Sequence, residues 1–89
     1  MNSLTTTQFW KLYNALSVRV QRRADRAYEL WQINPQAPGL YFKRVGKRLP
    51  VYSVRIDKGH RALGILEGDS MLWFWIGSHD AYEDLLQHL

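Results

Sequence analysis

The sequence predicts an α+β fold: an N-terminal helical hairpin packed on a mostly antiparallel four-stranded sheet, followed by a short C-terminal helix. Two observations on spacing support it. Apolar residues recur with a helical period before residue 35 and after residue 78, and with a period of two between residues 40 and 77. The 89 residues are 46% hydrophobic and 13% aromatic, so we expect one domain, residues 1–89, around one core.

The first expected helix carries Phe9, Leu12, Tyr13 and Leu16 at i, i+3, i+4 and i+7. Thr7 is placed to cap its N-terminus, because a threonine hydroxyl can accept a hydrogen bond from a free backbone amide there.

The second expected helix has one apolar stripe, formed by Val20, Ala24, Ala27, Tyr28 and Trp31. Ser17 can cap its start, and Asn34-Pro35 ends it because the residue before a proline is displaced from helical geometry. Few residues separate the two helices, so they should form an antiparallel hairpin.

The last expected helix repeats the helical spacing in Tyr82, Leu85, Leu86 and Leu89, with Ser78 as its cap. Four strands are expected before it, at Leu40–Val45, Val51–Ile56, His60–Leu66 and Met71–Gly77. The last of these is apolar on both faces over Met71–Ile76, which places it in the sheet interior. A further short strand at Leu4–Thr7 is an open alternative.

Charge and composition restrict the function. Twelve Lys and Arg against eight Asp and Glu give a net charge of +4, which favours an anionic partner. The chain has no cysteine, no phosphate-binding loop, no dinucleotide motif and no metal-binding His/Glu pair, so we expect no cofactor and no metal. No secretory signal or membrane-length apolar run is visible, which favours a cytoplasmic protein without membrane contact.

Basic side chains near the sheet are the candidate functional residues. Along the second strand, Val54 and its alternate neighbours should face the helices, which leaves Arg55 on the open face. Lys58 and Arg61 follow at the next turn, and His79 lies where the last strand meets the last helix. A basic hairpin tip at the other end of the sheet contains Lys43, Arg44, Lys47 and Arg48.

Each candidate also has a structural interpretation. Arg55 and Lys58 can be solvated surface charges, and Arg61 can form an ion pair with a carboxylate such as Asp57. His79 can be an ordinary hydrogen-bonded surface residue, and Tyr82 belongs to the apolar stripe of its helix.

Two further sets are interpreted as structural. We expect Trp73 and Trp75 to be core residues rather than a base-stacking platform, and His60 to be a turn residue. The arginine stripe on the second helix is expected to be solvated, with an acidic partner or a phosphate backbone as the alternative; it comprises Arg19, Arg22, Arg23 and Arg26.

The order and spacing of three runs resemble the C-terminal half of toxins of the RelE/ParE superfamily. In that family a basic strand leads through a Gly-Tyr/His-Arg turn into a central strand that ends in Gly-x-His/Arg. The matching runs here are Val51–Ile56, Gly59–Gly64 and Phe74–Tyr82. Phe9-Trp10, Tyr28–Trp31 and Asn34-Pro35 are similar to one branch of the family, so the resemblance extends over the whole chain.

The resemblance implies a toxin of a type II toxin–antitoxin system, held silent by a cognate antitoxin. For RelE-like members it implies metal-free cleavage of mRNA on the ribosome, by attack of a ribose 2′-hydroxyl on the adjacent phosphate. By position, Arg61 and Arg55 would stabilise the phosphate, and His79 would act as general acid or base. Tyr82 would orient or stack on a nucleotide.

The sequence departs from RelE at two places. RelE has a pair of lysines where this chain has Ser53 and Arg55, and an arginine is a poor base because it stays charged. RelE also has an arginine at the position of His79, where several family members have histidine. A non-enzymatic inhibitor of DNA gyrase, as in ParE members, and an inactive antitoxin-binding module therefore remain alternatives.

Overall fold

A computed structural model describes residues 1–89 and gives three helices and five strands in the order βααββββα. The helices are α1 (Thr7–Asn14), α2 (Val18–Ile33) and α3 (His79–Leu86). The strands are β1 (Asn2–Thr5), β2 (Lys43–Arg44), β3 (Val51–Asp57), β4 (His60–Glu67) and β5 (Ser70–Ser78). None of the helices is both long and apolar enough to cross a membrane.

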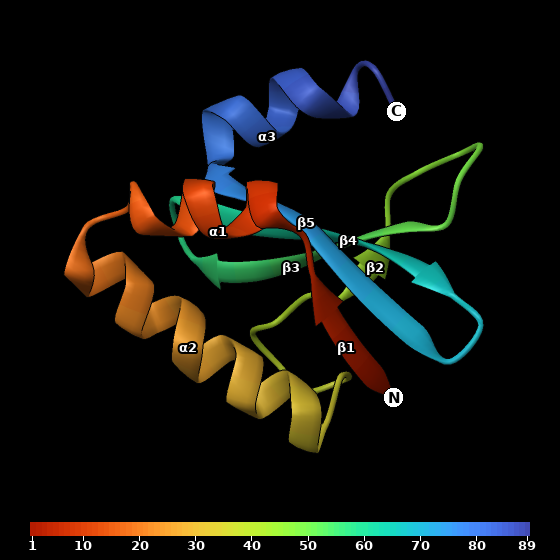
Figure 1. Ribbon diagram of the computed structural model, residues 1–89, viewed down its shortest axis with the longest axis horizontal. Coiled ribbons are helices and arrows are strands. Elements are labelled where there is room, and N and C mark those ends of the chain that lie inside the picture. Colours follow the sequence, from red (N-terminus) through yellow and green to blue (C-terminus); the bar gives the residue numbers. More distant parts are fainter.

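The sheet has the strand order β1-β5-β4-β3-β2, with β1 parallel to β5 and every other pair antiparallel. The α1–α2 hairpin covers one face, and α3 packs on the other (Figure 1). This confirms the predicted α+β class and the interior position of β5. The predicted four strands become five, because the N-terminal strand forms at Asn2–Thr5, two residues earlier than Leu4–Thr7.

Local side chains set the helix ends. The Ser17 hydroxyl accepts from the Val20 amide at 3.3 Å, and the Ser78 hydroxyl accepts from the Ala81 amide at 3.2 Å, so both predicted caps are confirmed. The prediction of Thr7 as the cap of α1 is wrong by one residue. Thr6, in extended geometry, accepts from the Phe9 amide at 3.0 Å, whereas Thr7 is already helical.

The strand expected at Leu40–Val45 shrinks to Lys43–Arg44. Tyr41 has φ of 46°, in the left-handed region, and a residue in that conformation cannot continue a pleated strand. The segment still pairs with the edge of the sheet on both sides of Tyr41. Before it, the Leu40 carbonyl accepts from the Arg55 amide at 2.7 Å, and after it β2 pairs with β3.

Two apolar clusters hold the layers together. The larger one, the hairpin-side core, lies under the helical hairpin around Trp31, Met71 and Ile76, each 1% exposed or less. The smaller one, the α3-side cluster, joins Val51 and Leu63 to Tyr82 of α3. The predicted parity of β3 is confirmed, because Val54 faces the hairpin and Val51 the opposite side. That opposite face is not open along its length, however, because Tyr82 of α3 packs on Val51 and Leu63.

A register irregularity between Leu63 and Gly64 places Phe74 and Trp75 consecutively against the α3-side cluster. Trp73 stays in the hairpin-side core at 4% exposure, whereas Trp75 is only partly buried on the other face. The Trp75 ring crosses Gly77 so closely that a Cβ there would meet its Cζ2 at 2.7 Å. The two tryptophans therefore have different environments.

Candidate functional site

Arg55 and Arg61 lie directly opposite each other on β3 and β4. Both side chains project to the α3 side of the sheet, as do their alternate neighbours Ser53 and Leu63, and both are partly exposed. Two positively charged side chains directly opposite on adjacent strands repel each other. The sheet thus places two guanidinium groups together at the end where β3 turns into β4.

Neither guanidinium has a carboxylate partner. Arg61 Nη1 donates to the backbone carbonyls of Asp57 at 2.7 Å and His60 at 2.9 Å, and its Nε and Nη2 donate to no protein atom. The Arg55 side chain makes no hydrogen bond to the protein and lies over the Tyr41 ring, with Cζ 5.5 Å from the ring centroid. The free Nε/Nη2 edge of Arg61 is the fork that binds a phosphate or carboxylate with two parallel hydrogen bonds.

The carboxylate of Asp57 is occupied elsewhere, so the expected alternative of an Asp57–Arg61 ion pair is not found. It accepts from Arg23 of α2 at 3.0 Å, from the Gly59 amide at 2.9 Å, and contacts His60 Nδ1 at 2.9 Å. Burial alone would raise the pKa of Asp57, but the hydrogen bonds from His60, Arg23 and Gly59 together hold it below its ordinary value of 3.8.

This arrangement fastens the β3–β4 turn to α2. The tight turn at Asp57-Lys58-Gly59 follows from the sequence, but its attachment to α2 does not, because Arg23 and Asp57 are 34 residues apart. His60 is the first residue of β4 rather than a turn residue, and its ring contacts Asp57. Arg23 departs from the solvated arginine stripe by binding Asp57.

Replacing Asp57 with asparagine is expected to lower the free energy of unfolding by about 1–2 kcal/mol at pH 7, because charge-assisted hydrogen bonds are lost and one partner is solvent-exposed. Since the folded-state pKa of Asp57 is depressed, its contribution is present above about pH 4 and disappears as the pH falls through the folded-state value. Urea unfolding of both proteins between pH 2 and pH 7 should therefore converge at low pH.

The matched control for this prediction is Asp69→Asn, which changes an exposed carboxylate that has no side-chain partner. It should leave stability unchanged across the same pH range. A difference between wild type and Asp57→Asn that is independent of pH would contradict the assigned role of the carboxylate charge.

His79 is the first residue of α3, and its position at the strand–helix junction is as expected. Its amide donates to the Gly59 carbonyl at 2.8 Å, which ties the end of β5 to the β3–β4 turn. Its Nε2 lies 3.2 Å from Glu83 Oε1, and its side chain is 40% exposed. Arg61 is paired with Gly77, two residues before His79, so the three candidates Arg55, Arg61 and His79 gather at one end of the sheet.

Tyr82 is 5% exposed, and its hydroxyl lies 3.3 Å from Ser53 Oγ. A ring buried in this way has no free face for a stacked base while α3 stays in place. The geometry therefore matches the packing role of Tyr82 and contradicts the stacking role that the resemblance implied. Ser53, at 2% exposure, is also enclosed.

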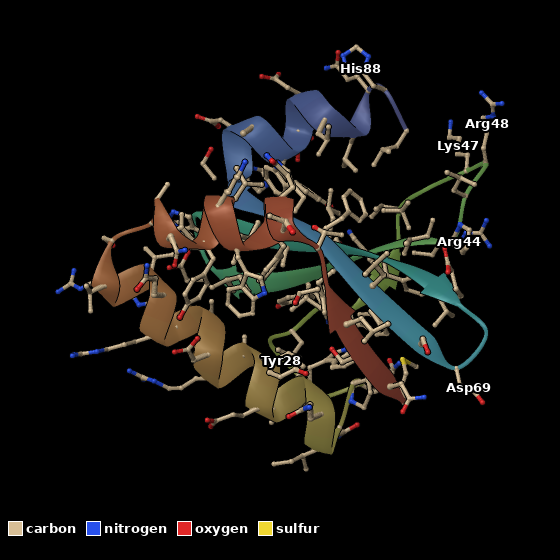
Figure 2. All side chains as sticks on the ribbon, in the orientation of Figure 1. Tyr28, Arg44, Lys47, Arg48, Asp69 and His88 are labelled. Carbon is tan, nitrogen blue, oxygen red and sulfur yellow. The ribbon has the colours of Figure 1, made fainter.

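The other basic candidates are spread along the sheet. Lys43 pairs with Ser53 and so projects to the same face as Arg55, and Lys58 is exposed in the β3–β4 turn. Arg44 is the last residue of β2, and Lys47 and Arg48 lie in the loop before β3; all three are at the far end of the sheet from that turn (Figure 2). They form no single surface with the arginine pair.

Several solved structures share this fold. YafQ from E. coli superposes with a TM-score of 0.73 at 12% identity, over 91% of this chain and 96% of that one. A YoeB/ParE toxin from Agrobacterium tumefaciens gives 0.69 at 18%, over 89% and 99%. The RelB–RelE antitoxin–toxin complex from Methanococcus jannaschii gives 0.69 at 17%, over 92% and 96%. The fold is therefore that of RelE-like and ParE-like toxins.

Sequence comparison identifies the family. The sequence model of the ParE-like toxin domain matches residues 18–84, which is most of the chain. No curated protein matches the chain by sequence. The chain belongs to the ParE-like toxin family.

Proposed function

We propose that this toxin is a metal-independent, ribosome-dependent endoribonuclease that cleaves mRNA in the cytoplasm and so inhibits translation. The observation that supports it best is the Arg55–Arg61 pair. Two guanidinium groups held opposite each other without a carboxylate destabilise the sheet unless an anion lies between or above them. A phosphodiester supplies that anion, and the free donors of both arginines suit its oxygens.

The proposed reaction is an attack by a ribose 2′-oxygen on the adjacent phosphorus. The 2′-hydroxyl loses its proton, the P–O5′ bond breaks, and the departing 5′-oxygen gains a proton. Negative charge accumulates on the phosphate oxygens in between, where preorganised guanidinium groups stabilise it most. Arg55 and Arg61 supply this electrostatic stabilisation, and neither can act as a base.

His79 is the residue that we assign to proton transfer. An imidazole accepts and donates protons near neutral pH, and that of His79 is accessible at the end of the sheet where the arginines gather. Glu83 Oε1, 3.2 Å from His79 Nε2, can orient the ring. We exclude Tyr82 from the proposed set because of its burial.

A cognate antitoxin is the proposed partner that silences the toxin. Similar structures from Methanococcus jannaschii, Pyrococcus horikoshii and E. coli are complexes of RelE with RelB. The excess of basic residues, at a net charge of +4, favours an acidic partner segment for this chain too.

A non-enzymatic toxin acting on DNA gyrase is the second candidate. It is favoured by the enclosure of Ser53 and Tyr82, which leaves His79 as the main acid–base group near the arginine pair.

Mapping of new RNA 5′ ends within minutes of inducing the toxin in bacteria separates the two candidates. Endonucleolytic cleavage on the ribosome should give ends phased with codons, and the variant Arg61→Ala/His79→Ala should give none. The control variant Arg48→Ala/His88→Ala removes the same residue types from exposed positions remote from the β3–β4 turn, and should cleave like wild type (Figure 2). Growth arrest without new ends would overturn the ribonuclease proposal in favour of gyrase.

A further inference from the structure

Tyr41 has an unusual backbone. It is the one residue other than glycine with a positive φ, at 46°, and a bulky side chain is strongly disfavoured there. Glycine or asparagine would occupy this conformation with less strain. A tyrosine in this strained backbone conformation indicates that its ring has a role that compensates for the strain.

Core packing does not provide that role. The Tyr41 side chain is 63% exposed, whereas its neighbour Phe42 is packed against the hairpin-side core, with its ring 5.8 Å from that of Trp31. Phe42 and Leu40 anchor the segment on either side, and Leu40 is 3% exposed. The strained backbone at Tyr41 thus holds a large aromatic ring outside the protein interior.

The ring lies beside the arginine pair. The Leu40 carbonyl accepts from the Arg55 amide at 2.7 Å, which aligns this segment with the end of β3. The Arg55 guanidinium sits over the Tyr41 ring at 5.5 Å, a cation–π distance. Across the sheet the order is therefore Tyr41, Arg55, Arg61, with an exposed aromatic ring next to two guanidinium groups that have no acidic partner.

We propose that Tyr41 is a substrate-binding residue that stacks on the base of a nucleotide adjoining the phosphate bound by Arg55 and Arg61. Aromatic stacking beside a cationic backbone site is the usual means of holding single-stranded nucleic acid. With Arg55 over one face of the ring, the other face receives the base. This inference rests on the proposed ribonuclease function and specifies how the same site holds its RNA.

The test uses the whole toxin and ribosomes programmed with an mRNA that carries 2-aminopurine in the A-site codon. A 2′-O-methyl group on that codon prevents cleavage, and stacking of the base on a protein ring quenches the fluorescence. Wild type and Tyr41→Phe should quench, whereas Tyr41→Gly should bind roughly ten-fold or more weakly and quench little. Thermal unfolding of Tyr41→Gly should be unchanged or shifted upward, because glycine relieves the positive φ.

The outcomes separate this inference from the function on which it rests. If wild type neither binds nor quenches, the proposed function and the stacking role both fail. If wild type quenches, Arg61→Ala weakens binding and Tyr41→Gly behaves like wild type, only the stacking role fails. A Tyr41→Gly variant that loses thermal stability together with binding would show a structural residue and would also overturn the inference. A wild-type toxin that binds ribosomes without quenching would direct Tyr41 to a protein partner instead.

Discussion

Replacement of Arg61 by alanine is expected to slow single-turnover cleavage of mRNA on programmed ribosomes by about 10²–10³-fold, the usual cost of removing one preorganised donor to a transition-state oxyanion. The structure explains why the effect should be large. Two carbonyl hydrogen bonds hold Arg61 Nη1 at 2.7 Å and 2.9 Å, so the remaining Nε/Nη2 fork is fixed before substrate arrives. A fixed donor pair needs little reorganisation when charge develops on the phosphate.

Lysine should restore little of this loss. Arg61→Lys keeps the charge but offers a flexible point charge in place of the planar fork, so we expect it to stay within about ten-fold of Arg61→Ala. The control is Arg22→Ala, which removes an exposed arginine from α2. Full activity of Arg61→Lys would show that charge alone suffices and that the fork geometry has no role.

Arg55 provides a complementary measurement. Because the Arg55 side chain makes no hydrogen bond to the protein and lies opposite Arg61, Arg55→Ala should reduce cleavage while raising the free energy of unfolding by about 0.2–1 kcal/mol through lost repulsion. Opposite changes in activity and stability are typical of a residue retained for its ligand. A loss of both would instead indicate that the cation–π contact with Tyr41 stabilises the edge of the sheet.

The features that the sequence predicted correctly depend on short-range chemistry. Ser17 and Asn34-Pro35 bound α2 because a cap and a proline act within one helical turn, and the parity of β3 follows from the alternation of its own side chains. Arg55 and Arg61 could be placed on neighbouring strands because a tight turn at Asp57–Gly59 joins them. The position of His79, where β5 meets α3, was also predicted from neighbouring residues.

The features that the sequence did not predict depend on contacts between distant residues or on backbone geometry without a sequence signature. Arg23 and Asp57, which form an ion pair, are 34 residues apart. The left-handed φ of Tyr41 contradicts the residue preference at that position, and the register shift beside Gly64 reverses the side of Trp75. Tyr82 is buried where α3 packs on the sheet, whereas the family resemblance implied that it contacts a nucleotide.

The largest expected effect on stability is that of Trp31→Ala. Trp31 is 1% exposed at the centre of the hairpin-side core, with its ring 5.1 Å from Trp73 and 5.8 Å from Phe42. Truncation of such a side chain costs about 3–5 kcal/mol, since apolar burial is lost and a cavity remains. A domain of this size has a total stability of roughly 4–13 kcal/mol, so the variant should be partly unfolded or close to it at 37 °C.

Trp31→Phe separates the cost of lost packing from the effect of the buried indole N–H. The indole Nε1 of Trp31 is buried without a hydrogen-bond partner, and phenylalanine removes that unsatisfied donor, whose desolvation costs about 1–3 kcal/mol. Phenylalanine also leaves a smaller cavity than alanine, so its net cost in urea unfolding should stay below about 1.5 kcal/mol. Trp10→Ala, at a side chain that is 47% exposed, should cost less than Trp31→Ala. If Trp31→Phe and Trp31→Ala were equally destabilising, the indole N–H would have a partner that offsets its burial, and the core around Trp31 would depend on polar contact as well as on packing.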